Sequence, residues 1–302
     1  MNEYNYYDVI IIGGSYAGLQ AATTLGRALR KVLVIDSGKP CNIQTPHSHN
    51  FLTQDGKPPA AIAAIAREQL RSYTTVSILD SRVTEAEQVG VEFSIKTLLG
   101  ETITARKLIF ATGVNDLMPA IPGFAECWGI SVIHCPYCHG YEVSHQPTGI
   151  LANGDAGYEY AKLISNWTND LTLFTNGAST LTVEQRQKLT DKHINIIQTD
   201  LQEIAHEQGQ MKSLIFKDGS KYQVKAMYAR PPFEQHCDLP VQLGCTLNDH
   251  GLLETNGFGK TNVPGIYVAG DNSVLMRSVA NAVATGMMAG AMLNKELIEE
   301  DF

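Results

Sequence analysis

The chain has 302 residues, of which 44% are apolar, a composition typical of a globular protein with room for two domains. Its formal charge of −8 comes from interspersed acidic and basic residues, which leaves no basic stripe for nucleic acid and no polybasic patch for a membrane. The partners expected are therefore small molecules or neutral protein surfaces.

The N-terminus, MNEYNYYDVI, lacks the basic region and small-residue cleavage site of a secretory signal, which predicts cytoplasmic residence. The apolar segment 278–293 carries Gly286 and Gly290 at the spacing of membrane helix dimers, but it is short and contains Asn281. We expect a buried C-terminal helix there and no membrane partner. Six cysteines are too few over this length for a disulfide scaffold, which favours catalytic or ligating roles for a close pair.

Residues 7–38 predict a strand over 8–12, a glycine turn, a helix to about Leu29 and a second strand over 32–35. This βαβ unit opens a doubly wound sheet. Gly13 permits the tight turn, Gly18 allows close packing of helix on strand, and Ser15 replaces the middle glycine of the dinucleotide fingerprint. Asp36 ends the second strand, where a carboxylate can bind ribose hydroxyls.

Two later segments read as strands that end in ligand-binding residues. ARKLIFATG, residues 105–113, ends in Thr112 and Gly113, and VPGIYVAGD, residues 263–271, ends in Gly270 and Asp271. Because ligands bind at the carboxyl edge of such sheets, these residues are candidates for cofactor contacts.

A second βαβ pattern spans residues 148–177, the place for a nicotinamide nucleotide. Its turn reads Ala152, Gly154, Gly157, so the first glycine of the fingerprint is missing. Its second strand ends in LTLFTNG, which offers neither an acid for a ribose diol nor an arginine for a 2′-phosphate. The domain therefore either binds NAD(P)H in an unusual way or keeps the fold without the cofactor, and we favour the second alternative.

HCPYCHGYE, residues 134–142, is open to three chemistries. One tetrahedral zinc cannot take both cysteines and both flanking histidines of so short a run without strain, and Cys237 and Cys245 have the wrong spacing for a second half-site. CPYCH matches the haem attachment pattern, which belongs to exported proteins. Thiol redox chemistry is favoured, because one cysteine of a CxxC pair attacks a partner disulfide and the other resolves the mixed disulfide.

The glycine turn GGSYAG, the strand ends and a CxxC placed between the two halves of an FAD domain resemble the pyridine nucleotide–disulfide oxidoreductase class. Within it, the chain resembles the low-molecular-weight thioredoxin reductase family over almost its whole length. GGSYAG together with CPYCHGYE is similar to the branch that contains gliotoxin and holomycin dithiol oxidases and bacterial thioredoxin reductase-like proteins. The chain departs from true thioredoxin reductases at His139, which replaces an aspartate, and at TNGAST, which replaces a basic 2′-phosphate motif.

The resemblance implies an α/β fold of two Rossmann-like, three-layer nucleotide-binding domains with a discontinuous FAD domain. We expect FAD binding by residues 1–114 and 246–302, and an NAD(P)-like domain carrying the CxxC over residues 115–245. The resemblance also assigns the FAD contacts, which include the N-terminus of the last helix: Gly13, Ser15, Ala17, Gly18, Asp36, Asn50, Thr112, Gly113, Gly270, Asp271, Ser278 and Val279.

The catalytic residues carried over are Cys138, facing the flavin, Cys135, exchanging with substrate thiols, and His139 as acid/base, since an imidazole titrates near neutral pH. His139 could instead only position the turn. His134 is as readily structural, and Glu142 either orients His139 or is a solvated acid.

The implied function is FAD-dependent dithiol–disulfide exchange with a thioredoxin-like protein or a small molecule, in a homodimer. The electrons would pass to or from NAD(P)H, oxygen or a protein such as ferredoxin, and a role for NAD(P)H is doubtful. The alternatives are an NAD(P)H-dependent thioredoxin reductase, an oxygen-dependent dithiol oxidase and a non-enzymatic flavoprotein redox sensor.

Overall fold

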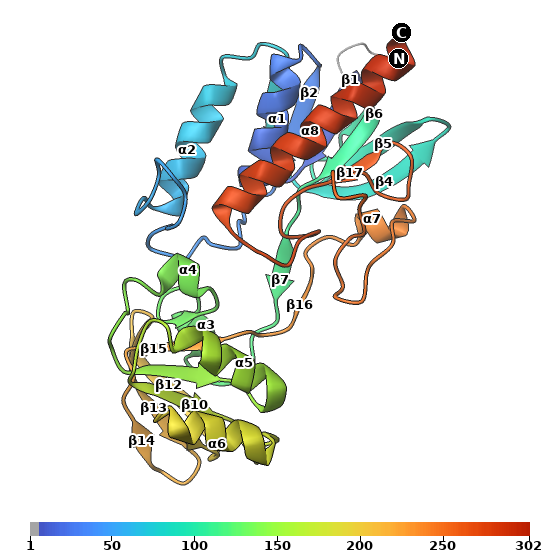
Figure 1. Cartoon of the computed structure of the whole chain (residues 1–302). Coiled ribbons are helices and arrows are strands. Elements are labelled where there is room, and N and C mark those ends of the chain that lie inside the picture. The colour runs from blue at the N-terminus through green and yellow to red at the C-terminus, as the bar shows by residue number, and fades with distance from the viewer. Residues whose placement is uncertain (1–5) are drawn as a thin grey trace. The chain divides into compact units, whose positions relative to one another are not determined.

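The computed structural model describes residues 6–302, which divide into two compact units (Figure 1). The first unit is formed by the chain up to Ile43 together with Asn50–Asn115 and Phe233–Phe302, and the second by Gln44–His49 and Asp116–Pro232. Each unit is built around its own sheet and its own apolar clusters.

These units differ from the expected domain boundaries in two places. Residues 233–245, expected in the second domain, belong to the first unit, because Leu239 and Cys245 are buried in its core. Residues 44–49, expected in the first domain, belong to the second unit, where Thr45 packs beside Gly129. The pattern of apolar residues in these two segments does not indicate which hydrophobic core each segment joins.

The first unit is built on a seven-stranded sheet in the order β3-β2-β1-β6-β5-β4, with β17 also paired to β6. Strands β1, β2, β3, β6 and β17 are parallel, and β4 and β5 add an antiparallel hairpin to the first half of β6. The strands are β1 (Tyr6–Ile12), β2 (Val32–Asp36), β3 (Val76–Asp80), β4 (Val83–Val89), β5 (Glu92–Thr97), β6 (Thr102–Phe110) and β17 (Ile266–Val268).

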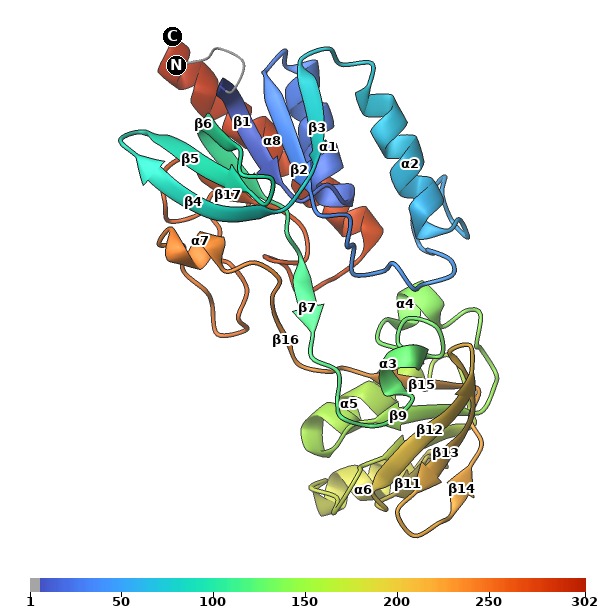
Figure 2. The ribbon, with the colours of Figure 1, turned by 180° about the vertical axis from the view of Figure 1, so that it is seen from behind.

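Three long helices belong to this sheet: α1 (Tyr16–Arg27), α2 (Pro59–Leu70) and α8 (Val279–Asp301). Alternate residues of the buried strands face opposite apolar clusters, so Val9 and Ile11 of β1 pack with α1 and α8, while Ile10 and Ile12 pack with β4, β5 and β17. Figure 2 shows α1 and α8 together against one face of the sheet. A short helix, α7 (Leu239–Gln242), supplies Leu239 to the cluster on the other face.

Helix α8 lies against α1, and the two glycines noted in the sequence serve this contact. A Cβ on Gly286 would lie 2.2 Å from the carbonyl oxygen of Ala17, and one on Gly290 would lie 3.0 Å from that of Ala21. The expectation of a packed C-terminal helix is therefore confirmed. Within residues 6–302, no helix has the length and apolar character needed to cross a membrane.

The second unit has a parallel sheet in the order β11-β10-β9-β15-β8 and a separate antiparallel sheet in the order β12-β13-β14. Strands β7 and β16 pair with each other where the chain passes between the units. The strands are β7 (Val114–Asp116), β8 (Val132–Ile133), β9 (Thr148–Leu151), β10 (Leu171–Phe174), β11 (Asn195–Ile197), β12 (Leu201–Glu207), β13 (Gln210–Phe216), β14 (Lys221–Tyr222), β15 (Ala226–Ala229) and β16 (Phe233–Gln235). The helices are α3 (Phe124–Cys127), α4 (Pro136–His139), α5 (Gly154–Ile164) and α6 (Val183–Asp191).

The two predicted βαβ units are present as β1-α1-β2 and β9-α5-β10, each with parallel strands. The α/β fold with two Rossmann-like halves is therefore confirmed. In both halves the glycine turn lies at the carboxyl end of the first strand, which is the edge where nucleotides bind in such sheets.

Candidate active site

The cysteine pair lies at the start of α4, directly after the buried strand β8. Cys135 has extended backbone angles and caps the helix, and Pro136 occupies its first position, where proline is favoured because no N–H is needed. The backbone N–H groups of Cys138 and His139 both donate to the carbonyl oxygen of Cys135. This single turn brings the side chains of the two cysteines within hydrogen-bonding reach of each other.

The surroundings of Cys135 favour its thiolate. A hydrogen bond from Cys138 lowers the pKa of Cys135 to about 7, and the N–H groups of Tyr137 and Cys138 and the positive charge of Arg230 act in the same direction against partial burial. A thiolate is the form that attacks disulfides. The thiolate form of Cys135 is therefore favoured near neutral pH.

His139 ends the same turn and is held largely neutral. Burial lowers the pKa of His139, the nearby His49 lowers it further, and Glu142 opposes both. His49 belongs to the segment Gln44–His49 of the second unit, and its Nδ1 lies 3.5 Å from Oε1 of Glu142. A neutral imidazole can accept a proton from a thiol, so the lowered pKa agrees with the acid/base role expected for His139.

His134 has a structural setting. Its ring stacks on Trp128 with centroids 5.6 Å apart, and its carbonyl oxygen accepts a hydrogen bond from the hydroxyl of Tyr160. Within residues 6–302, no three His, Cys, Asp or Glu side chains come together to hold a metal ion.

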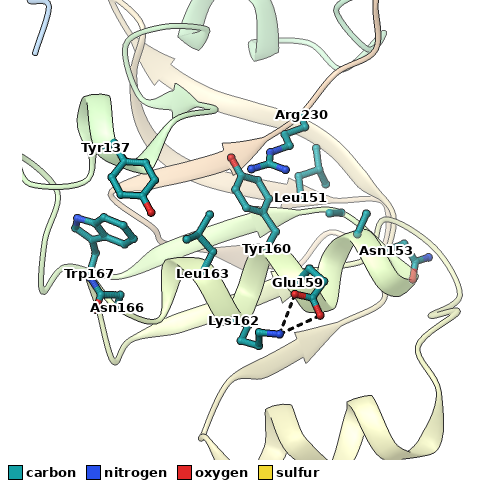
Figure 3. A pocket seen from close by; sticks show the side chains of 12 residues that line it. Tyr137, Leu151, Asn153, Glu159, Tyr160, Lys162, Leu163, Asn166, Trp167 and Arg230 are labelled. Carbon is teal, nitrogen blue, oxygen red and sulfur yellow. Dashed lines mark hydrogen bonds and ion pairs between the residues drawn. The ribbon is translucent and has the colours of Figure 1, made fainter. Parts of the chain in front are cut away.

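A pocket of about 980 Å³ lies beside the cysteine turn, within the second unit (Figure 3). Tyr137, which stands between the two cysteines, forms one wall and meets the edge of Trp167 at a centroid distance of 5.5 Å. The guanidinium of Arg230 lies over the ring of Tyr160, 4.2 Å from its centroid. The remaining lining comes from β9, the turn after it and α5: Leu151, Ala152, Asn153, Ala156, Glu159, Lys162, Leu163 and Asn166.

The second glycine turn is closed by its own side chains. Oδ1 of Asn153 accepts hydrogen bonds from the N–H groups of Gly154, at 2.8 Å, and Thr180, at 2.9 Å, while its Nδ2 donates to the carbonyl oxygen of Ala178. Gly154 has a φ of +56°, and a Cβ there would lie 2.6 Å from Oγ1 of Thr180. Asp155 adds a carboxylate to the first turn of α5, where the helix dipole would otherwise attract a phosphate.

The end of β10 provides no replacement for the missing nucleotide contacts. Asn176 has a φ of +47°, and its Oδ1 accepts from the N–H of Leu201. Gln185 of α6 donates to the carboxylate of Asp155 instead of facing a ligand. The residues around this turn therefore do not fit the pyrophosphate and ribose of a conventionally bound NAD(P)H.

The first glycine turn is tightly built. Gly13 has a φ of +109°, and a Cβ on Gly18 would lie 1.8 Å from the carbonyl oxygen of Gly13. Ser15 caps α1 without a side-chain hydrogen bond to the helix. The first turn of α1 carries no acid, so nothing there opposes a pyrophosphate.

Carboxylates stand at both expected points of the FAD half. Asp36, at the end of β2, is ion-paired with Arg67 of α2. Asp271, three residues after β17, has Nε of Arg277 at 3.4 Å. The buried Oδ1 of the adjacent Asn272 has no hydrogen-bond partner within the described residues, which fits a ligand that brings a donor to this edge. This half therefore fits FAD, except that Arg67 already shares one oxygen of Asp36.

The remaining FAD candidates all lie in the first unit. Asn50 has a φ of +58° and Thr53 one of +73°, so the loop after His49 is strained at both positions. Ser278 caps α8, at Val279, by accepting from the N–H of Asn281. Four others lie in turns or the first helical turn at the carboxyl edge: Ala17, Thr112, Gly113 and Gly270.

Sequence reasoning missed four residues that surround the thiol pair: His49, Tyr160, Trp167 and Arg230. His49 lies within a run of histidines in PHSHN, which is a weak signal for proximity to the CxxC. The others reach the site only through tertiary packing.

The chain matches the family model of pyridine nucleotide-disulphide oxidoreductases over residues 7–286. It is 33% identical to thioredoxin reductase tcpT of Claviceps purpurea, over 99% of this chain and 97% of that protein. Among solved structures, it resembles an oxidoreductase of Agrobacterium tumefaciens with a TM-score of 0.91 and 36% identity, over 97% of this chain and 99% of that one. It also resembles HlmI with a TM-score of 0.93 and 31% identity, over 100% of this chain and 95% of that one. The chain belongs to the pyridine nucleotide-disulphide oxidoreductase family and is a thioredoxin reductase-like enzyme of this FAD-dependent class.

Proposed function

We propose that the enzyme exchanges electrons between a dithiol or disulfide substrate and a flavin through Cys135 and Cys138, without NAD(P)H bound in the conventional way. The observation that carries this proposal is the contrast between the cysteine turn and the nucleotide turn of the second unit. At the thiol pair, the pKa values of Cys135 and His139 are both lowered, while Asn153 ties Gly154 to Thr180 across the nucleotide turn.

In the direction of disulfide reduction, the exchange takes place in two steps. The Cys135 thiolate attacks one sulfur of the substrate disulfide, which breaks the S–S bond and releases one substrate thiolate. Cys138 then attacks Cys135, releases the second thiolate and closes the Cys135–Cys138 disulfide. Two electrons have passed from the pair to the substrate, and His139 takes the Cys138 proton and hands it to a leaving thiolate. Oxidation of a dithiol substrate is the same sequence reversed.

FAD, when bound, accepts or donates the two electrons of the pair. On the protein side, the glycine turn at Gly13, the carboxylate of Asp271 and the N-terminus of α8 at Ser278 are the groups proposed to hold and orient it. The roles of Cys138 toward the flavin and of Cys135 toward the substrate come from the resemblance and are part of the proposal.

The cysteine roles are tested by Cys135→Ser and Cys138→Ser, each purified with FAD bound. Both variants should lose disulfide exchange and keep the flavin. If Cys138 faces the flavin, Cys135→Ser should show long-wavelength absorbance from a thiolate next to the flavin, and Cys138→Ser should not. The reverse pattern would exchange the two roles, and full activity in either variant would contradict the proposal.

The electron source is tested by anaerobic reduction with NADH, NADPH or dithiothreitol while the flavin absorbance is followed. Loss of a bidentate charged contact weakens binding by about 1.5–3 kcal/mol, or roughly ten- to hundredfold. NADPH should therefore reduce the flavin slowly and without preference over NADH, and dithiothreitol should act considerably faster.

The second candidate is an NAD(P)H-dependent thioredoxin reductase. It is favoured by the intact β9-α5-β10 unit, in which Gly157 still packs against the turn. Rapid, saturable flavin reduction by micromolar NADPH would establish this candidate. Arg186 of α6 is the nearby cation that could then bind the 2′-phosphate, and Arg186→Ala should abolish such reduction.

We also propose that the substrate is a small molecule or a thioredoxin-like protein, that oxygen or a protein such as ferredoxin is the alternative electron partner, and that the enzyme works as a cytoplasmic homodimer. Six cysteines are too few over this length for a disulfide scaffold, which suits a reducing compartment. Sedimentation of the flavin-loaded protein measures the oligomeric state. Continued turnover with substrate would exclude a sensor, which changes state once and stops.

A further inference from the structure

The pocket beside the cysteine turn has no role in the proposed electron exchange described so far. Its volume of about 980 Å³ is that of a site for a whole small molecule, at the upper end of the usual range. Because its lining belongs to the second unit alone, its shape is defined by α4, α5 and the ends of β9 and β15.

The pocket adjoins the nucleophile. Tyr137 lies two residues after Cys135 and lines the pocket, and the hydroxyl of Tyr160 donates to the carbonyl oxygen of His134, the residue before Cys135. The positive charge of Arg230, also in the lining, reaches Cys135. Cys135 does not line the pocket itself, but Tyr137, Tyr160 and Arg230 connect the lining to the cysteine turn.

The walls are aromatic and apolar. Tyr137 and Trp167 meet edge to face, and Figure 3 shows their rings together at one end of the pocket, with Leu163 between them and Tyr160. Leu151 adds an apolar surface near the other end. Such a lining favours a planar, apolar body, since aromatic rings gain from both burial and ring contacts.

The residues that line the pocket carry one positive charge that no lining carboxylate neutralises, that of Arg230. Glu159 and Lys162 neutralise each other, with Nζ 2.9 Å from a carboxylate oxygen. Arg230 has no carboxylate partner within residues 6–302; its guanidinium rests on the Tyr160 ring, where an aromatic face stabilises a cation without cancelling its charge. Its N–H groups remain suited to a carboxylate brought by a ligand.

We propose that this pocket binds the non-reacting part of the substrate, and that it selects a small aromatic disulfide or dithiol carrying a carboxylate that pairs with Arg230. The proposal rests on the proposed exchange at Cys135 and Cys138, which it extends by naming the substrate class. The lining includes Ala152, Asn153 and Ala156 of the second glycine turn, so the substrate would lie where a conventional Rossmann domain holds its nucleotide.

The test compares two coloured aromatic disulfides that differ in charge: anionic dithiobis(nitrobenzoate) and neutral dithiodipyridine. The flavin-loaded enzyme is reduced with dithiothreitol, desalted, and mixed with each disulfide at a pH well above the pKa of about 7 of Cys135, so that the nucleophile is a thiolate throughout. The quantity measured is the ratio of the two rates of thiol release in a single turnover. Arg230→Gln should lower this ratio about three- to tenfold, and Arg230→Lys should keep most of it.

Lys212→Met is the matched control. Lys212 is an exposed lysine on β13, paired with Glu207, and it does not line the pocket. Its loss removes one positive charge from the same unit and should leave the ratio within about 1.5-fold of the wild type. The wild-type ratio should also fall at high salt, because the pair with an exposed arginine is screened.

Three results would overturn the inference in distinguishable ways. An unchanged ratio in Arg230→Gln would refute the pairing of a substrate carboxylate with Arg230 and would leave the proposed thiol exchange untouched. Equal loss of both rates would assign Arg230 to Cys135 alone. With all variants made in a Cys41→Ser background, release of two thiols per enzyme at an unchanged rate in Cys135→Ser would instead contradict the proposed function itself.

A separate experiment tests whether the pocket prefers aromatic disulfides. Lipoate is an anionic disulfide without an aromatic ring, and lipoamide is its neutral counterpart. Trp167→Leu should lower the rate with dithiobis(nitrobenzoate) relative to the rate with lipoate about threefold or more. The ratio of the lipoate rate to the lipoamide rate should be unchanged in this variant, because that ratio depends on Arg230. Equal slowing of all four disulfides would show that Trp167 only supports the cysteine turn through its contact with Gly140.

Discussion

Nδ1 of His49 lies 3.5 Å from Oε1 of Glu142, and both side chains act on His139. They act in opposite directions, because His49 lowers the pKa of His139 and Glu142 raises it. A residue placed early in the chain and one placed after the CxxC thus set the protonation of the proposed acid/base residue.

The two variants should therefore shift the acid side of the pH–rate profile of disulfide exchange in opposite directions. His139 can act as a base only when its imidazole is neutral, so the acid limb of the pH–rate profile follows the pKa of His139. Glu142→Gln removes a cause that raises this pKa and should move the limb to lower pH. His49→Gln removes a cause that lowers it and should move the limb to higher pH. Shifts in one direction for both variants, or a limb that survives in His139→Gln, would assign the base elsewhere.

The reactivity of Cys135 should follow a midpoint of about 7. Alkylation by iodoacetamide, measured against pH in a Cys41→Ser background, reports the thiolate, since Cys41 is the exposed competitor. The thiolate is present above the midpoint and lost as the pH falls through it. Cys138→Ser weakens the largest cause of the lowered pKa, so its midpoint should lie higher. An unchanged midpoint would mean that the helix turn and Arg230 suffice.

Asn153 should contribute to the stability of the second unit. Asn153→Ala removes the cap of α5 and its bonds to Thr180 and Ala178, which should lower the free energy of unfolding by about 1–2 kcal/mol. Denaturant unfolding measures the change. Asn166→Ala, an exposed residue of the same region, should stay within about 0.5 kcal/mol of the wild type. Equal stability of the wild type and Asn153→Ala would contradict this account.

Gly286 should be irreplaceable in the contact between α8 and α1. Gly286→Ala places a Cβ 2.2 Å from the carbonyl oxygen of Ala17, and the overpacking should cost about 1–3 kcal/mol despite the better helix propensity of alanine. Met287→Ala, on the half-exposed side of the helix, should cost less. Thermal unfolding of the flavin-loaded proteins compares the two, and a stabilised Gly286→Ala would mean that the helices separate readily.

The elements of the fold were predictable wherever local pattern decides structure. The first unit's glycine turn joins an apolar strand to a helix, and the observed β1, α1 and β2 lie within a few residues of the expected bounds. The hairpin β4-β5 and the second unit's β12-β13-β14 sheet carry no comparable motif, and the sequence did not place them. The confirmed Rossmann-like halves therefore rest on turns whose geometry only a few residue types permit.

The thiol turn was predictable as a motif, but its surroundings were not. Cys135 and His139 lie four positions apart in the sequence, whereas Arg230 and His49 reach the turn from about 90 residues away on either side. The poor match of the second nucleotide turn was visible in its residues. The reason it is closed, the three bonds of Asn153, needed the structure, because Thr180 follows β10 by several residues of irregular loop.

In a nucleotide-dependent Rossmann domain, the loop after the second strand is completed by the coenzyme. Here Oδ1 of Asn153 accepts hydrogen bonds from the N–H groups of Gly154 and Thr180 at the nucleotide turn. If no nicotinamide coenzyme binds there, as we propose, its addition should not raise the melting temperature of the protein. Under the proposed function, the output of the enzyme then follows the ratio of dithiol to disulfide in its surroundings and is indifferent to the ratio of reduced to oxidised coenzyme.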